Sequence, residues 1–163
     1  MGFASHLGPW LLGTNKYTTG TTAGTIQNMG ATTVAQVATT TVSDTAATFL
    51  FVIPAGSQIL DFTVDITTAY AGTTGNTITI QTAAGNSLAT VGGATTTPLA
   101  VGRATTAYTG AQVATMLNVG STDLIVNVIY ACAGTASGGA ATITCRYIVK
   151  GSNGAMYPTS TQN

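Results

Sequence analysis

The amino-acid sequence predicts an all-β protein: an antiparallel β-sandwich of jelly-roll type, preceded by an extended N-terminal arm. Threonine is the most frequent residue, and with valine, isoleucine and aromatic residues it favours the pleated surface of a strand. Twenty glycines punctuate the chain at turn-like spacing, whereas the helix-favouring residues Lys, Glu, Arg and Gln are scarce. Several short segments also alternate apolar and polar residues, which is the period of a half-buried strand.

The length of 163 residues suits one domain with an extended arm. The expected parts are an arm at residues 1–30, a sandwich at 31–150 and an irregular tail at 151–163. Three large apolar residues of the arm follow neither helix nor strand periodicity: Trp10, Leu11 and Leu12. Because such residues on a free arm favour aggregation, we expect them to pack on the body of the protein or on a neighbouring subunit. A frayed terminus is the alternative.

The first two strands are expected on either side of a turn at residues 54–57 (PAGS). Residues 47–53 (ATFLFVI) are apolar on both faces, which predicts a central strand. Residues 58–69 alternate instead, and their predicted core face consists of Leu60, Phe62, Val64 and Ile66. The two strands are therefore expected to form a hairpin.

A second hairpin is expected from residues 76–82 and 87–91, joined by a turn at 83–86 (AAGN). In the first of these strands, Ile78 and Ile80 are expected to face the core.

The last part of the domain contains one ambiguous segment and a third expected hairpin. Residues 112–119 (QVATMLNV) fit either a short helix or a strand. Residues 124–132 and 141–150 both have strand composition, and the glycine-rich segment 133–140 lies between them.

The two cysteines lie on either side of that last loop. If Tyr130 pairs with Tyr147, Cys132 and Cys145 also lie opposite one another, and a disulfide is geometrically conceivable. Two buried free thiols are the preferred interpretation, because the cytoplasm is reducing.

Charged residues make up only 5% of the chain, against about 25% in an average soluble protein, and the formal net charge is zero. This low, balanced charge favours a protein whose normal state is associated with other subunits. It argues against nucleic-acid binding, which depends on clusters of Lys and Arg. The longest aliphatic or aromatic run, residues 49–53, is too short to cross a membrane. The N-terminus lacks the basic segment of a secretory signal, so synthesis is expected in the cytoplasm.

Four of the charged residues share a regular spacing. Asp61 and Asp65 are four residues apart in one predicted strand, and Arg146 and Lys150 repeat this spacing in the last one. We expect the two sets to face one another across strands or across a subunit boundary; four solvated side chains are the alternative. The two carboxylates would lie roughly 13 Å apart at about 3.3 Å per residue, too far for glycosidase chemistry.

The sequence predicts that the protein is not an enzyme. His6 is the only histidine, and no neighbouring carboxylate or thiol orients it for acid–base chemistry. Two cysteines without histidine partners do not form a zinc site. Phosphate-binding, dinucleotide-binding, nucleophile-elbow and HExxH motifs are absent from the sequence. No catalytic residue, metal ligand or cofactor is therefore expected.

Several segments together are similar to a known group of proteins: residues 6–14 (HLGPWLLGT), 28–30 (NMG), 53–59 (IPAGSQI), 64–65 (VD) and 141–148 (ATITCRYI). They resemble small virion structural proteins of tailed phages that infect marine bacteria and cyanobacteria. The resemblance implies a capsid decoration, or cement, protein on the capsid exterior, with the major capsid protein as its partner. It also implies self-association, often as a homotrimer. The residues expected at assembly contacts are Trp10, Leu11, Leu12, Asp61, Asp65, Arg146 and Lys150.

Two other functions compete with this interpretation. A tail or head-fibre component would bind host glycans through exposed aromatic rings, for which the candidates are Tyr17, Tyr70, Tyr108 and Tyr157. A secreted carbohydrate-binding module would usually require an export signal, which is not expected at this N-terminus.

Overall fold

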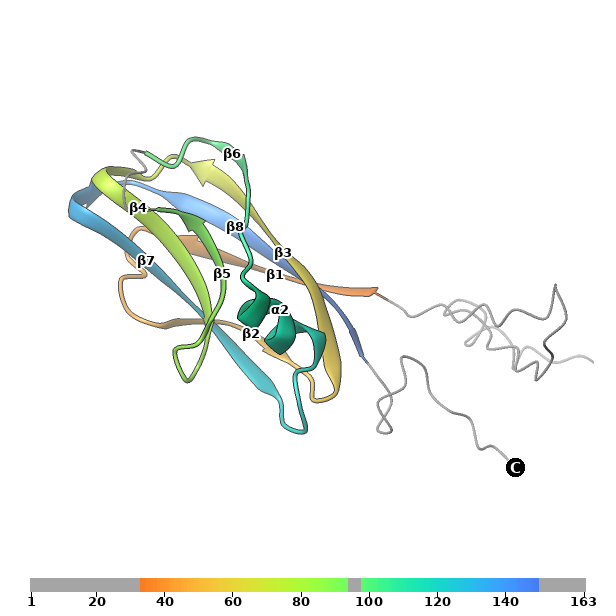
Figure 1. Cartoon of the computed structure of the whole chain (residues 1–163). Helices are drawn as coiled ribbons and strands as arrows, with labels where there is room; N and C mark the ends of the chain where they lie inside the picture. The colour runs from red at the N-terminus through yellow and green to blue at the C-terminus, as the bar shows by residue number, and fades with distance from the viewer. Residues whose placement is uncertain (1–32, 94–97, 150–163) are drawn as a thin grey trace, which may run out of the picture.

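The computed structural model describes residues 33–93 and 98–149, shown in colour in Figure 1. These residues form strands and one short helix, so the predicted all-β class is confirmed. The elements are β1 (Thr33–Thr41), β2 (Thr48–Ile53), β3 (Ser57–Thr68), β4 (Ala71–Thr82), β5 (Ser87–Gly92), β6 (Gly102–Ala104), α2 (Gly110–Leu117), β7 (Leu124–Ser137) and β8 (Ala140–Val149). The predicted arm (1–30) and tail (151–163) lie outside the described residues.

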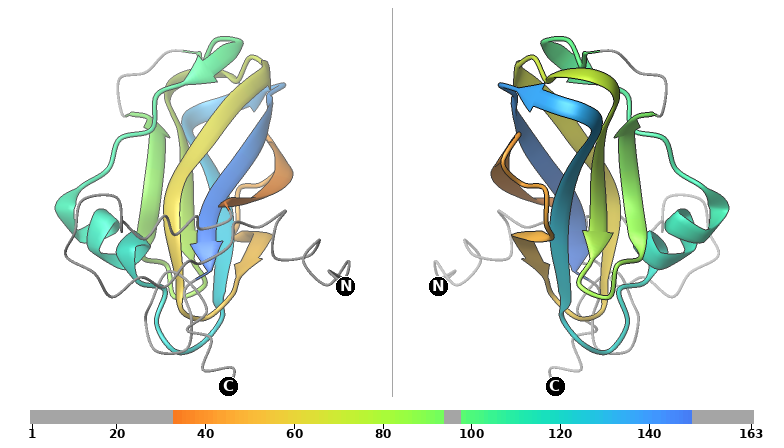
Figure 2. Two further views of the ribbon diagram at one scale, coloured as in Figure 1. Left: turned by 90° about the vertical axis from the view of Figure 1, so that its right-hand side faces the viewer. Right: turned by 90° about the vertical axis from the view of Figure 1, so that its left-hand side faces the viewer.

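The strands form two four-stranded antiparallel sheets, ordered β1-β8-β3-β6 and β2-β7-β4-β5. The two sheets face one another as the layers of a sandwich, with one hydrophobic core between them (Figures 1 and 2). Consecutive strands change sheets at every step except between β4 and β5. This strand order is that of an eight-stranded jelly roll.

Only one of the three predicted hairpins is present in the described structure. β4 and β5 pair as expected, with Ile78 and Ile80 completely buried. The prediction is wrong for β2 with β3 and for β7 with β8, because the members of each pair lie in different sheets. Alternation of apolar and polar residues shows that a strand buries one face. It does not show whether the next strand pairs beside it in the same sheet or packs against it across the core from the other sheet.

The link between β7 and β8 consists of two glycines that carry the chain from one sheet to the other. Gly138 and Gly139 have φ angles of 70° and 144°, which residues with a side chain rarely adopt. At Gly139, an added Cβ would lie 2.3 Å from the buried ring of Tyr70. Glycine is therefore required here for both conformation and space.

Strand β2 is an edge strand, not the central strand that its sequence predicts. The register shifts between Phe49 and Phe51, so that Leu50 and Phe51 are both buried. Phe49 and Val52 remain 59% and 40% exposed. The run is apolar on both faces because one face fills the core and the other forms an apolar surface.

The predicted core face of β3 is correct except at Leu60. Phe62, Val64 and Ile66 are buried. The register shifts between Ile59 and Asp61, so Ile59 takes the core position and Leu60 becomes the exposed extra residue of a bulge.

Two tyrosines form a polar centre inside the core. The Tyr70 and Tyr130 rings are tilted against one another with their centroids 4.8 Å apart. Tyr130 donates its hydroxyl to Oδ1 of the buried Asn76, and Tyr70 donates to the carbonyl oxygen of Thr40. The buried hydroxyls are therefore satisfied within the fold.

The segment left open between helix and strand is the helix α2. Thr109 caps its N-terminus: the Gln112 amide donates to the Thr109 hydroxyl, and the Gln112 side chain accepts from the Thr109 amide. Met116 is its buried residue, and Gln112 Nε2 donates to Ser87 Oγ on β5. The helix packs against β3 and β5 on the side of the sandwich remote from β1 and β2 (Figure 2).

Candidate assembly surfaces

The outer face of the β1-β8-β3-β6 sheet is rich in hydroxyls. Strand register places four threonines of neighbouring strands in two cross-strand pairs: Thr39 opposite Thr142, and Thr144 opposite Thr63. Their side chains alternate with the buried residues of the same strands and therefore point away from the core.

Two ion pairs lie on the same face. Asp61 is opposite Arg146 on β8, and Arg146 Nε donates to Asp61 Oδ1 at 2.8 Å while its Nη2 donates to Oδ2. Asp65 is opposite Arg103 on β6, and Nε and Nη2 of Arg103 donate to the two carboxylate oxygens at 2.8 and 3.1 Å. Both arginines bind the carboxylate through two nitrogens, which fixes the planes of the two groups.

These pairs lower the carboxyl pKa values. The hydrogen bond from Arg146 is the largest cause of the low pKa of Asp61, and the hydrogen bond from Arg103 has the same effect on Asp65. Both carboxylates are ionised at neutral pH, and each charge is matched by its arginine. The pairs are open to solvent, so water screens them. Their main consequence is a sheet face without net charge.

The structure brings together part of the predicted set of charged residues. Arg146 meets Asp61 across neighbouring strands, one of the two arrangements expected from their spacing. The partner of Asp65 among the described residues is Arg103, which the sequence analysis missed. Strand β6 is only three residues long and has no periodicity that would mark it. Lys150, like Trp10, Leu11, Leu12 and His6, lies outside the described residues.

A small apolar patch lies on the outer face of the other sheet. It consists of Phe49 and Val52 on β2 and Ile125 on β7, and Val52 lies directly opposite Ile125. All three side chains are exposed, Ile125 to 45%. Contiguous exposed apolar residues are typical of surfaces that contact another molecule.

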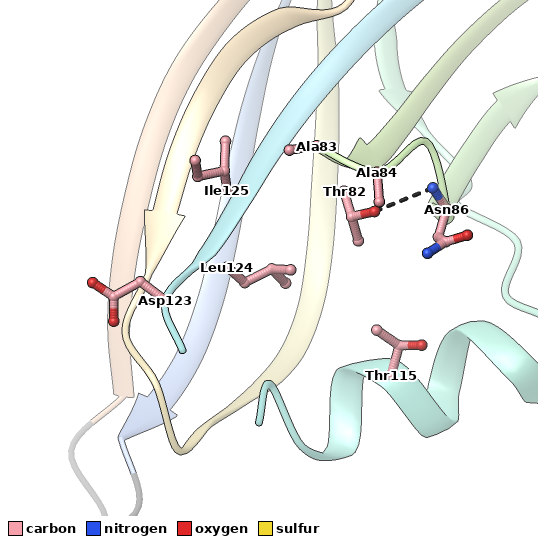
Figure 3. A pocket seen from close by; sticks show the side chains of 8 residues that line it. All are labelled: Thr82, Ala83, Ala84, Asn86, Thr115, Asp123, Leu124 and Ile125. Atoms are coloured by element: carbon pink, nitrogen blue, oxygen red, sulfur yellow. Dashed lines mark hydrogen bonds between the residues drawn. The ribbon is translucent and has the colours of Figure 1, made fainter. Parts of the chain in front are cut away.

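A shallow pocket of about 360 Å³ lies between the β4–β5 turn, α2 and the start of β7 (Figure 3). Its lining residues are Thr82, Ala83, Ala84, Asn86, Thr115, Asp123, Leu124 and Ile125. Thr82 Oγ1 accepts from the Asn86 amide, and Asp123 Oδ1 accepts from the Ala55 amide, so these polar groups already serve the local turns. None of these described lining residues is aromatic, so they do not provide the stacking surface expected of a glycan site.

The tyrosines proposed as glycan platforms do not form one where they are described. Tyr70 is completely buried, contrary to the expectation of an exposed loop ring. Tyr108 is half-buried, and its hydroxyl accepts from the Phe62 amide and donates to the Phe62 carbonyl oxygen. Tyr17 and Tyr157 lie outside the described residues.

The remaining reactive groups are held apart by the fold. Cys132 and Cys145 lie in opposite sheets and are free thiols, so the pairing that would have joined them is wrong. Burial raises the pKa of the Cys145 thiol to about 12, which keeps it protonated. Burial likewise raises the pKa of Tyr70 to about 12.

Within residues 33–93 and 98–149, no three His, Cys, Asp or Glu side chains cluster as metal ligands would. No helix of that part of the chain has the length and apolar character needed to span a membrane.

Comparison with known proteins adds no relative. No protein-family model matches the sequence, and no curated protein matches it significantly.

Proposed function

We propose that this chain is a phage virion structural protein, specifically a capsid decoration protein that binds the outer surface of the major capsid lattice and stabilises the head. The observation that carries the proposal is the outer face of the β1-β8-β3-β6 sheet, which combines exposed hydroxyls with ionic side chains closed into two pairs. Such a face neither attracts nor repels a partner by net charge. It offers hydrogen bonds over a broad, ordered surface.

The fold supports the proposal by analogy. Double-sheet jelly rolls occur among viral capsid domains, although the same architecture also serves lectins and cupins. The sequence resemblance to virion proteins of tailed phages favours the first of these uses. The pocket and tyrosines described above give no specific support to the fibre alternative.

The mechanism requires a large contact area with the capsid subunits, repeated over the particle. It involves no chemical step and no cofactor. Each copy spans a joint between capsid subunits through many modest contacts, and the symmetry of the lattice repeats those contacts over the particle. Separation of two capsid subunits then requires the loss of several such contacts at once. A latch formed by Trp10, Leu11 and Leu12 is part of the proposal, whereas the homotrimer stays an expectation that rests on the resemblance alone.

A binding experiment with matched variants tests the proposed face. The full chain is mixed with capsids that lack it, from the phage whose genome encodes it, and bound chain is measured by co-sedimentation. Thr144→Lys places a charge in the middle of the hydroxyl-rich face, whereas Thr79→Lys places the same charge on the outer face of the other sheet. We expect native chain and Thr79→Lys to bind and Thr144→Lys to bind at least about tenfold more weakly. Failure of the native chain to bind would contradict the proposed function.

A further inference from the structure

The edge strands on the two sides of the sandwich differ in how far they are blocked against pairing with another chain. β5 and β6 form the edges on one side, and β1 and β2 form them on the other (Figure 2). An open strand edge invites pairing with another chain, and proteins usually block it with short strands, charges or covering segments. The β5–β6 side shows all three devices: β6 has three residues, it carries Arg103, and β5 is covered by α2 and by a bridge from Thr90 to Ala107.

Along residues 33–39, strand β1 shows none of these devices among the described residues; Asp44 covers the edge only at Thr41, the last residue of the strand. It is nine residues long, and its sequence TVAQVATTT contains neither a charge nor a proline. It is the terminal strand of its sheet as far as the chain is described, and it pairs there with β8. Val37, at the centre of β1, is 62% exposed.

The hydrogen bonds at the end of β1 show which backbone groups face the open edge. Thr41 donates its amide to Asp44 Oδ2 and accepts the Asp44 amide, so both of its backbone groups point away from β8. The next amide, that of Val42, points the other way, to the Gly139 carbonyl oxygen beside β8. Backbone direction alternates along an antiparallel strand, and β1 pairs with β8 without a register shift. The residues whose amides and carbonyls point to the open edge are therefore Thr33, Ala35, Val37 and Thr39.

The neighbouring edge of β2 is partly occupied from within the chain. Gln36 donates its side-chain amide to the Val52 carbonyl oxygen at 2.9 Å and to the Tyr147 hydroxyl at 2.8 Å. The Gln36 side chain thus braces β1 against the second sheet. This holds β1 in an extended shape suitable for pairing.

We propose that β1 pairs antiparallel with β1 of a second copy of this chain across a two-fold axis. The register that uses all four outward-facing residues places Thr33 opposite Thr39 and Ala35 opposite Val37 of the second copy. The two four-stranded sheets then join into one continuous sheet, and main-chain hydrogen bonds provide the affinity.

The charge pattern favours a second copy of this chain as the partner of the open β1 edge. Near a two-fold axis each residue lies close to its own equivalent, so a charged strand repels itself. β1 carries no charge, and the nearest described carboxylate, Asp44, is held by Thr40 and Thr41 at the far end of the strand. The charged residues of this sheet lie on β3, β6 and β8.

This contact does not depend on where the protein acts, and so it goes beyond the proposed function. It predicts a two-fold pair, whereas the sequence resemblance implies a homotrimer. The oligomeric state in solution distinguishes the two.

Sedimentation of the full chain over a range of concentrations tests the contact. Val37→Lys is compared with Val101→Lys, because Val101 is equally exposed (65%) but precedes β6 on the other side of the sandwich. We expect dimers for the native chain and for Val101→Lys. Val37→Lys should raise the dimer dissociation constant at least about tenfold with an unchanged circular dichroism spectrum.

A cross-linking variant tests the register without relying on loss of binding. In the double variant Ala35→Cys with Val37→Cys, the two new thiols lie opposite their partners across the axis, within disulfide range. Mild oxidation should give a covalent dimer, whereas the native chain, with Cys132 and Cys145 only, should not.

Three outcomes would overturn the inference: a native chain that is monomeric at all concentrations, an oligomer that Val37→Lys leaves intact, or no cross-link in the double variant. A native monomer that dimerises after deletion of residues 1–30 would show that the chain covers its own edge, and this also overturns it. Capsid binding by a native monomer would retain the proposed function while rejecting this contact. A dimer that does not bind capsids would retain this contact while rejecting the proposed function.

Discussion

Arg103 lies directly opposite Asp65 in the neighbouring strand and binds both oxygens of its carboxylate. Strand β6 is only three residues long, so this side-chain contact supplements very few ladder hydrogen bonds. The pair therefore ties a short edge strand to the centre of its sheet. It also leaves this part of the outer face without net charge.

Arg103→Gln should loosen β6 while leaving the rest of the sandwich intact. Without the guanidinium, the low pKa of Asp65 should return toward 3.8, because the hydrogen bond from Arg103 is the largest cause of its depression. Hydrogen exchange of residues 102–104 should accelerate, and a carboxyl titration followed by NMR should show the rise in pKa. The same exchange rates and the same Asp65 pKa in both proteins would contradict this account of the pair.

The sign of the pH effect follows from the depressed pKa. A carboxyl group that is more acidic in the folded state stabilises the fold above its unfolded pKa, and this contribution is lost as the pH falls through the folded value. Asp61 and Asp65 both behave in this way. Stability should therefore fall below pH 3.8 in the native chain, and less so in Asp61→Asn. Urea unfolding at pH 7 and at pH 3 makes the comparison.

Gly139→Ala should destabilise the fold by more than about 1 kcal/mol. The φ angle of 144° and the Tyr70 ring both exclude a side chain at this position. Gly138→Ala is the matched control, because its φ of 70° is also positive but no atom lies within 4 Å of the added Cβ. Urea unfolding should show a larger loss for Gly139→Ala; equal losses would mean that Tyr70 does not determine the effect.

The alternating pattern was sufficient to predict strands, but the pairing of strands depends on features that the pattern does not contain. The hairpin of residues 76–82 and 87–91 was predicted correctly because a short polar turn joins two strands of one sheet. The same reasoning was wrong for β7 and β8, where two glycines cross between sheets. It also missed the bulge at Leu60, because one extra residue leaves the composition of a strand unchanged.

The contact between charged residues was predicted only where register could be inferred. Asp61 and Arg146 meet because both stand in long, recognisable strands. Arg103 was missed because β6 lacks periodicity, and the exposure of Phe49 was missed because apolar residues on both faces suggested a central position. The sequence alone does not distinguish an apolar side chain in the core from one on the surface.

Asn76→Ala should cost about 1–3 kcal/mol of the free energy of unfolding. Asn76 is completely buried, and its side chain accepts from Tyr130 and bonds both backbone groups of Gly72. Its removal leaves buried donors without acceptors. Asn127→Ala, on the outer face of β7, should change stability by no more than about 0.5 kcal/mol, and chemical unfolding of the two variants tests the difference. Equal losses would contradict the role assigned to the buried amide.

Deletion of residues 1–30 should leave the sandwich folded, because residues 34–148 already supply a packed hydrophobic core between the two sheets. If Trp10, Leu11 and Leu12 form a latch, the shortened chain should bind capsids more weakly than the native chain. Thermal unfolding checks the fold, and co-sedimentation checks binding. Undiminished binding of the folded, shortened chain would reject the latch.

A cryo-EM reconstruction of the native particle tests the proposed function most directly. The proposal predicts density for this eight-stranded sandwich on the outside of the capsid lattice, repeated by the capsid symmetry, with the outer face of β1-β8-β3-β6 against the capsid subunits. A particle whose capsid surface carries no such density, in a preparation where the chain is present elsewhere or missing, would contradict it.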